Sequence, residues 1–417
     1  MADEEESKGH TRRRVLTAGA AVAATAGLGA AAYSAWRNST YLFLMKDAPT
    51  HAGGADPAWK DALVRHYRPL GKTGIEMSDI SFGCGGIGSP DVVERAVDRG
   101  INYFDTSPDY SRTGSEQVVG KGLRAHRQKV FIASKFCSAD GHLPKDTPVA
   151  DIMRSVEGSL TRLQTDYLDV CIIHECNDLD RLMAPTFHEA FDRLKEQGKV
   201  RFLGVSSHTP NLEQVMRTAV DSGRFQMMLV AYNFKNWPDL TEIFHDAHER
   251  GIGVVAMKTL KGARATVLSD FVEGKQAFSQ AAFKWVLSNP DVSGLVVSIN
   301  DARQIDEYLY ASGQPLGAAD LALLERYDAL IAKDYCRPGC GACLDHCPNG
   351  VPVDDVFRYA MYAEDYGQPA MAKAQYARIP VSQNASCCAS CPAPCEAACP
   401  FEIPIRSKLM RFDRVLG

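Results

Sequence analysis

The chain has 417 residues, 45% of them hydrophobic, which is enough for one large core and a smaller module. Its formal net charge is -5 and no basic stripe runs through the middle of the sequence, which argues against a nucleic-acid-binding protein. Of its 13 cysteines, only Cys84, Cys137, Cys171 and Cys176 precede residue 336, so the last part of the chain is a separate chemical unit.

The N-terminal segment predicts export. The arginines Arg12 to Arg14 are followed by an uncharged stretch, rich in Ala and Gly, that runs from Val15 to Trp36. A twin arginine before a weakly apolar run is typical of the Tat route, whereas a permanent membrane anchor of about 20 residues is usually more apolar. We therefore predict a Tat signal over residues 1–36 that engages the Tat translocase, with a plain membrane anchor as the alternative. The protein is then expected in the periplasm, or tethered to the outer face of the cytoplasmic membrane.

After a polar linker over residues 37–66, short apolar runs alternate with segments of helical period. The expected strands are residues 79–85, 101–107, 130–136, 167–174, 200–208, 227–234, 252–260 and 293–300. The expected helices are residues 91–100, 115–126, 149–163, 187–198, 211–223, 240–251, 279–290 and 301–312. Apolar runs rich in Val and Ile are typical of parallel strands that are covered on both faces. Eight such units in about 250 residues predict a (β/α)8 TIM barrel over residues 67–312, followed by a connecting helix over 313–335.

A glycine-rich stretch offers a competing interpretation. Gly83, Gly85 and Gly88 match the G-x-G-x-x-G pattern of dinucleotide-binding Rossmann folds, and Asp105 follows about twenty residues later. The same pattern describes a short barrel loop, and the next helix begins only after Ser89 and Pro90. The eight regular units favour the barrel, and an exported Rossmann-type sugar oxidoreductase is the alternative.

Four chemically complementary side chains stand at the ends of the predicted strands. Asp105, Lys135 and His174 end three successive strands, and Tyr110 follows Asp105 by five residues. In a barrel these strand ends meet at one mouth. A phenol there can give its proton to a carbonyl oxygen, a nearby ammonium lowers the pKa of that phenol, and an imidazole orients the substrate. Each residue alone has a purely structural explanation, but the combination favours a proton-delivery site.

At this point the sequence resembles the aldo-keto reductase family over about residues 67–312. The resemblance rests on "YRPLGKTGIEMSDISFG", "GINYFDTSPDY", "LDVCIIH", "GKVRFLGVSSH" and "YNF", which occur in the family's order. It implies hydride transfer between a nicotinamide cofactor and a small-molecule carbonyl or alcohol, with Tyr110 as general acid in a tetrad with Asp105, Lys135 and His174. It also implies that Ser206 approaches the nicotinamide amide and that Tyr232 stacks on the ring. Lys258, in the segment "MKTLKG", is expected under the pyrophosphate.

The sequence departs from the family pattern at a few positions. Ser207 stands where Asn is frequent, and Gln304 and Tyr308 stand where Arg and Asn are frequent near the adenosine phosphate. The choice between NADP and NAD is therefore open. A metal site built from mouth residues is weighed against buried thiols that act as small hydrophobes, and the thiol interpretation is favoured. The residues concerned are Cys84, Cys137, Cys176 and His208.

Two tandem sets of four cysteines follow the barrel, and each set ends in Cys-Pro. The first is Cys336, Cys340, Cys343 and Cys347; the second is Cys388, Cys391, Cys395 and Cys399. Bacterial ferredoxins use C-x2-C-x2-C-x3-C-P, in which the fourth cysteine serves the other cluster. By this analogy two 4Fe-4S clusters are expected in residues 336–417, one on Cys336, Cys340, Cys343 and Cys399 and one on the other four. Zinc or disulfides are the alternatives, and Cys387 is an alternative to Cys388.

The sequence thus predicts an exported aldo-keto reductase-type oxidoreductase with a small α-helical, ferredoxin-like iron–sulfur domain and a redox partner protein. Clusters are inserted into a folded chain, and the Tat route carries folded, cofactor-loaded proteins, so the signal and the cysteines support each other. The alternative is a non-catalytic electron-relay subunit of a membrane redox complex.

Overall fold

The computed structural model describes residues 56–208, 210–235, 239–260, 272–273, 276–337, 340–364 and 369–417. The predicted Tat signal and most of the following linker lie outside these residues. Within them, no helix is both long enough and apolar enough to cross a membrane. All described residues belong to one unit, Pro49–Gly417.

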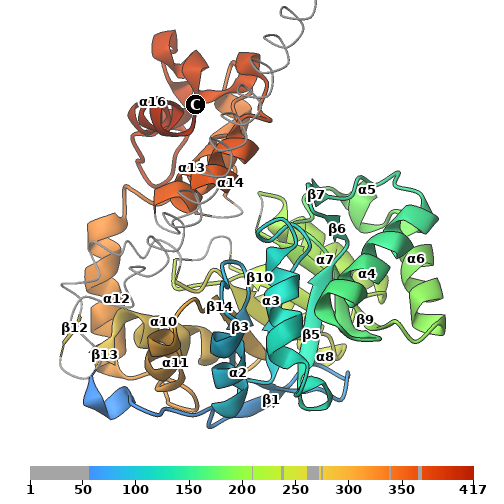
Figure 1. Ribbon diagram of the computed structural model, residues 1–417. Coiled ribbons are helices and arrows are strands. Elements are labelled where there is room, and N and C mark those ends of the chain that lie inside the picture. The colour runs from blue at the N-terminus through green and yellow to red at the C-terminus, as the bar shows by residue number, and fades with distance from the viewer. Residues whose placement is uncertain are drawn as a thin grey trace, which may run out of the picture. The chain divides into compact units, whose positions relative to one another are not determined.

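Eight parallel strands close into a barrel, each paired with its neighbours in chain order, and β14 pairs with β3 to complete the ring (Figure 1). The strands are β3 Ile80–Gly83, β4 Tyr103–Asp105, β5 Phe131–Lys135, β8 Leu168–Ile173, β9 Val200–Ser207, β10 Met227–Ala231, β11 Gly253–Met257 and β14 Gly294–Ser298. Each lies inside one of the eight apolar runs, so the predicted (β/α)8 barrel is confirmed. The closed ring also excludes the open sheet of a Rossmann fold.

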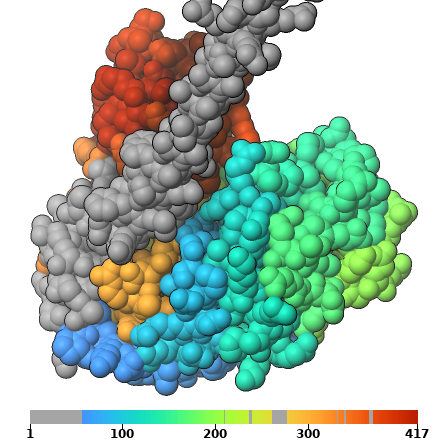
Figure 2. Space-filling view, viewed as in Figure 1, coloured from blue at the N-terminus to red at the C-terminus, as the bar shows by residue number. Residues whose placement is uncertain are grey.

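The strands alternate with helices, which are α2 Pro90–Asp98, α3 Gly114–Leu123, α4 Val149–Leu163, α6 Pro185–Glu196, α7 Leu212–Ser222, α8 Thr241–Glu249, α10 Phe278–Leu287 and α11 Ala302–Leu309. Neighbouring helices such as α2 and α3 or α4 and α6 contact each other. In Figure 2 the surface of this part of the chain passes from blue through cyan to green. Ser89 caps α2 through its side chain, and Gly223 ends α7 in the left-handed conformation. The main apolar core fills the layer between strands and helices.

Several short elements escaped the sequence analysis because strands of two or three residues carry no readable period. They are the hairpin β1 Tyr67–Pro69 with β2 Glu76–Ser78, the hairpin β6 Cys137–Ser138 with β7 Gly141–His142, the pair β12 Val272–Glu273 with β13 Gln276–Ala277, the helix α5 Leu179–Leu182, and the 3-10 turns Pro57–Trp59 and Arg127–Lys129. Leu70, Ile75 and Met77 of the first hairpin pack with residues such as Val170 and Met227 inside the barrel.

The chain beyond the barrel is helical. Its helices are α12 Ala318–Ile331, α13 Val353–Glu364, α14 Pro369–Tyr376, α15 Pro394–Ala397 and α16 Ile405–Leu416, with 3-10 turns at Leu344–His346, Val381–Gln383 and Ala385–Ser390. A separate apolar cluster joins α13, α14 and α16, and several of the tail cysteines pack against it. The expectation of a small helical module with many cysteines is met, while its ferredoxin-like character stays a prediction.

The contact between α3 and α4 gives a stability prediction. A Cβ on Gly120 would lie 2.5 Å from the carbonyl oxygen of Arg162 and 2.7 Å from the carbonyl carbon of Leu163, both backbone atoms that cannot move aside. We expect Gly120→Ala to lower the free energy of unfolding by about 1–3 kcal/mol, as overpacking does, although alanine is the better helix former. Urea titration followed by circular dichroism measures the change.

Gly158→Ala is the matched control, because its Cβ would meet only the flexible side chain of Arg162, with Nη1 at 3.0 Å. That substitution is expected to be neutral or to stabilise α4 by up to about 1 kcal/mol. Equal effects of the two substitutions would contradict the proposed close approach of α3 and α4.

Candidate active site

The structure brings together the four side chains predicted at the strand ends. Lys135, at the end of β5, donates through Nζ to Oδ1 of Asp105 and to the carbonyl oxygen of Thr106, both at 2.7 Å. The same Nζ lies 4.7 Å from the centre of the Tyr110 ring. The Tyr110 ring meets the imidazole of His174 edge-on, with ring centres 5.9 Å apart. Phenol, ammonium, carboxylate and imidazole are thus neighbours at one end of the barrel.

The ion pair between Lys135 and Asp105 is buried. The side chains of Lys135 and Asp105 are 0% and 5% exposed. A buried charge is tolerated only when it is paired, so Asp105 keeps the lysine in its ammonium form. The second carboxylate oxygen of Asp105, Oδ2, is buried and has no hydrogen-bond partner within the described part of the chain.

The phenol of Tyr110 differs from the expectation in one respect. Burial raises its pKa well above the usual value, and the carboxylates of Asp105 and Asp109 raise it further. The predicted lowering of this pKa is therefore wrong, because desolvation and the two carboxylates raise it. The phenol holds its proton throughout the neutral range, as a proton donor must.

The backbone that follows Tyr110 is strained. Ser111, Arg112 and Thr113 have φ values of 51°, 49° and 74°, in the left-handed region that residues with a side chain rarely adopt. Glu175, next to His174, and Lys258, after β11, share this conformation, with φ values of 45° and 56°. Such strain persists only where surrounding contacts enforce it, and it gathers here around one end of the barrel.

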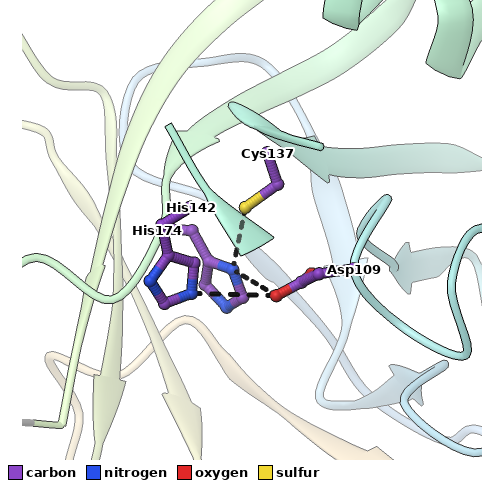
Figure 3. A group of neighbouring side chains, drawn as sticks. All are labelled: Asp109, Cys137, His142 and His174. Carbon is purple, nitrogen blue, oxygen red and sulfur yellow. Dashed lines mark hydrogen bonds and ion pairs between the residues drawn. The ribbon is translucent and has the colours of Figure 1, made fainter. Parts of the chain in front are cut away.

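Three mouth residues were missed by the sequence analysis: Asp109, His142 and Glu175. Hairpin β6–β7 brings His142 beside His174, with ring centres 4.6 Å apart (Figure 3). Its Nε2 lies 3.7 Å from Oδ2 of Asp109 and 3.4 Å from Oε2 of Glu175. The His142 side chain is 31% exposed. Partial desolvation by its neighbours, reinforced by His174, lowers its pKa to about 4. Asp109 precedes Tyr110 and Glu175 follows His174, so their position in the sequence could have identified both. No sequence pattern pointed to His142.

The soft ligands considered at the mouth do not form one group. Cys137 lies 3.3 Å from Nδ1 of His174 through its Sγ. Cys84 instead contacts the carbonyl oxygen of Phe82, and Cys176 contacts that of Asp178. His208 lies 3.3 Å from a guanidinium nitrogen of the tail residue Arg358. Only Cys137 among these four belongs to the cluster drawn in Figure 3.

The three predicted cofactor residues have different surroundings: one lies at the tetrad, one among aromatic rings and one against α13. Ser206 lies beside the tetrad, because its Oγ accepts a hydrogen bond of 2.9 Å from the backbone N–H of Glu175. Tyr232 packs between Phe244 and Trp285 and is 7% exposed, so its stacking on a nicotinamide stays a prediction. Lys258 donates through Nζ to the hydroxyl of Tyr362 in α13, at 2.9 Å.

A second residue of α13 reaches the mouth of the barrel. Arg358, 6% exposed, lies 3.0 Å from Oε1 of Glu175 through Nη2 and also binds Asp355 one turn earlier. Burial alone would raise the pKa of Glu175, but the positive groups around it, Arg358 foremost, together lower it. The helix that follows the first cysteine set is therefore joined to the residue next to His174.

The tail cysteines lie in two groups, and their role as cluster ligands stays a prediction. A pocket is lined by Cys336, Cys340, Cys343 and Cys399, together with apolar residues. Cys388 and Cys395 lie close enough to Cys347 and Cys391 to interact electrostatically with them. These four cysteines are the second group. Burial, reinforced by neighbouring thiolates, raises the pKa of Cys343 to about 12 and that of Cys388 to about 11. The Sγ of Cys387 contacts the carbonyl oxygen of Val381 instead, which favours Cys388 as the ligand.

Comparison with known proteins agrees with the barrel fold. Residues 89–278 match the aldo/keto reductase family. L-galactose dehydrogenase of Arabidopsis thaliana is 27% identical over 282 residues, which covers 58% of this chain and 87% of that protein. The uncharacterized oxidoreductase YqkF of Bacillus subtilis is 32% identical over 200 residues, which covers 45% of this chain and 63% of that protein.

A solved aldo-keto reductase from Bacillus halodurans, AKR11C1, superposes with a TM-score of 0.53 at 24% identity and covers 63% of this chain and 96% of its own. At that identity the likeness establishes the fold alone. Together with the match of residues 89–278, it shows that this chain has the barrel fold of the aldo-keto reductases and resembles that family in sequence over this segment.

Proposed function

We propose that the protein transfers hydride between a nicotinamide cofactor, NADP or NAD, and a carbonyl or alcohol substrate at the mouth of the barrel. The observation that carries this proposal is the position of the buried Lys135 ammonium. It is held by Asp105 and by the Thr106 carbonyl oxygen, and it lies under the ring of Tyr110. A phenol in contact with a buried cation is suited to giving up its proton and having the resulting anion stabilised.

The side chains then divide the chemistry among them. A bound nicotinamide supplies the hydride that adds to the carbonyl carbon. Tyr110 donates its proton to the carbonyl oxygen as that oxygen becomes an alkoxide. Lys135 stabilises the phenolate, and Asp105 holds Lys135 in its charged form. His174, in edge contact with the Tyr110 ring, orients the substrate oxygen.

The residues present fit the nicotinamide end of the cofactor better than its pyrophosphate end. The Ser206 hydroxyl accepts from Glu175 and keeps its own hydrogen for the nicotinamide amide. Lys258, expected at the pyrophosphate, is engaged by Tyr362. Binding of the dinucleotide therefore requires Lys258 to exchange the tyrosine hydroxyl for a phosphate oxygen.

We further propose two 4Fe-4S clusters in the tail, which supply one-electron transfer to or from a redox partner protein. Cys336, Cys340, Cys343 and Cys399 would hold one cluster, because they line a common pocket. The other would be held by Cys347, Cys388, Cys391 and Cys395, whose thiols are electrostatic neighbours. All thirteen cysteines lie in the described residues and none is in a disulfide, so each sulfur can lose its proton and bind iron as a thiolate.

Export completes the proposal. A Tat signal over residues 1–36 would direct the folded, cluster-loaded protein to the periplasm or to a tethered position on the outer face of the membrane. Thiolates already bound to iron would be protected there from forming disulfides.

Anaerobic purification tests the cofactor content directly. We expect about eight iron and eight sulfide per chain, as two 4Fe-4S clusters require, together with a bound or binding nicotinamide nucleotide. Cys347→Ser is expected to remove about half of the iron, since it takes one ligand from one cluster. Cys171→Ser, a change at a buried cysteine of β8 in the barrel, is the control and should leave the iron count unchanged.

Zinc in place of iron, or disulfides that form without loss of metal, would contradict the clusters. A full complement of iron without nicotinamide-dependent turnover of any carbonyl or alcohol would contradict the reductase proposal and favour an electron-relay subunit.

A further inference from the structure

We propose that Asp109, Cys137, His142 and His174 bind a Zn²⁺ ion at the mouth of the barrel (Figure 3). The site is separate from the tail cysteines, and its four ligands come from three segments: the loop after β4, hairpin β6–β7 and the end of β8. One ligand atom from each residue lies within 4.8 Å of all the others.

Three of the six distances between these atoms are close to the edges of a tetrahedron around zinc. With Zn–N and Zn–O bonds of about 2.0–2.1 Å and a Zn–S bond of about 2.3 Å, the edges of that tetrahedron are roughly 3.3–3.6 Å long. Nδ1 of His174 lies 3.3 Å from Sγ of Cys137 and 3.5 Å from Oδ2 of Asp109. Nε2 of His142 lies 3.7 Å from the same Oδ2. The other three distances are each at most 4.8 Å, so shifts of up to about 1 Å complete the site.

The donor set selects the metal. One thiolate, two imidazoles and one carboxylate are the ligand types that Zn²⁺ takes in tetrahedral sites. Mg²⁺ and Ca²⁺ demand six or more oxygen ligands, which this group does not offer. Because four protein ligands fill the tetrahedron, no position stays open for a catalytic water, so the ion positions side chains and does not activate water.

The surroundings of the ligands are already ordered. Cys137 and His142 face each other as a paired position of β6 and β7. The hydroxyl of Ser107 donates to Oδ1 of Asp109, which leaves Oδ2 toward the histidines. Glu175 lies beside the site, with Oε2 3.4 Å from Nε2 of His142 and Oε1 3.0 Å from Nη2 of Arg358. A hairpin that brings two ligands together and a fixed carboxylate lower the entropy cost of binding the ion.

A bound ion also sets the state of His174, and this step rests on the proposed function. When no metal is bound, Asp109 at Nδ1 favours the tautomer with hydrogen on Nδ1, so Nε2 is an acceptor. Metal on Nδ1 reverses this, and Nε2 then carries the hydrogen and can donate to a carbonyl oxygen. The ion would act as a positioning element for the reductase site.

Titration of anaerobically purified protein with Zn²⁺ tests the site by isothermal calorimetry. We expect wild-type protein to bind one equivalent of Zn²⁺ at this site. His142→Ala should bind that equivalent at least about tenfold more weakly. His245→Ala, at an exposed histidine on α8, is the matched control and should bind as the wild type does. Every variant keeps all eight tail ligands, so zinc taken up by the tail is the same in each.

Zinc-edge X-ray absorption separates the two kinds of site. The mouth site should show one sulfur and three nitrogen or oxygen neighbours, and Cys137→Ser should remove the sulfur, whereas a tail site would show four sulfurs. Equal zinc binding by wild type and His142→Ala, or a signal from four sulfurs alone, would overturn the proposal. Neither readout depends on reductase turnover, so failure of the proposed function would leave this result interpretable.

Discussion

Tyr110→Phe is expected to lower kcat for carbonyl reduction by about 100- to 10,000-fold, the usual contribution of a general acid, with little change in KM. The substitution keeps the ring that lies 4.7 Å from Lys135 and removes only the hydroxyl that would donate the proton. Steady-state kinetics with a nicotinamide cofactor and the best carbonyl substrate found gives the two constants.

Tyr103→Phe is the matched control for this experiment. Tyr103 lies in β4, two residues before Asp105, and its hydroxyl is buried with no hydrogen-bond partner in the described part of the chain. Its removal should leave turnover unchanged and stabilise the fold slightly, since an unsatisfied buried hydroxyl is costly. Equal turnover of Tyr110→Phe and wild type would refute the role assigned to the phenol.

Arg358→Met is expected to lower the free energy of unfolding by about 3–5 kcal/mol, which is the cost of leaving a buried charge unpaired. The guanidinium is 6% exposed and serves two carboxylates, Glu175 from the barrel and Asp355 from its own helix. Methionine fills a similar volume but cannot compensate either charge. Urea unfolding of the cluster-loaded protein under anaerobic conditions measures the loss.

Arg411→Met provides a matched comparison, because Arg411 pairs with Glu364 at the surface of the same module and is 44% exposed. A surface pair contributes at most about 1 kcal/mol, so this control should change little. Adding Glu175→Gln to Arg358→Met should recover part of the stability, since one unpaired charge is then gone. If Arg358→Met and Arg411→Met lost the same amount, the buried ion pair would have no special energetic role.

The barrel could be predicted because its strands are buried on both faces, so each appears in the sequence as a continuous apolar run. Asp105, Lys135 and His174 could be predicted because each ends such a run, and parallel strand ends share one edge of the sheet. The loop residue Tyr110 could be placed only as the fifth residue after Asp105. Its closeness to Lys135 follows from the turn of the chain, which the sequence does not show.

The rest of the site depends on contacts between segments that are distant in the sequence or too short to carry a pattern. His142 enters through a hairpin of two-residue strands, and Arg358 meets His208 across 150 residues of chain. The pKa of Tyr110 depends on how burial balances against charges of both signs, and the sequence gives the charges but not the burial. The assignment of the tail cysteines to clusters rests on their local spacing and stays a prediction.

The hydrogen bond between Lys258 and Tyr362 links the occupancy of the barrel to the position of the tail. If the pyrophosphate displaces Tyr362 from Lys258, nucleotide binding weakens the contact of α13 with the barrel. The equilibrium constant for that contact then falls by a fixed factor. Thermodynamic reciprocity then requires that a docked partner protein which draws α13 aside strengthens nucleotide binding by that same factor. If the tail transfers electrons as proposed, its affinity for the partner protein would then depend on whether nucleotide is bound to the barrel.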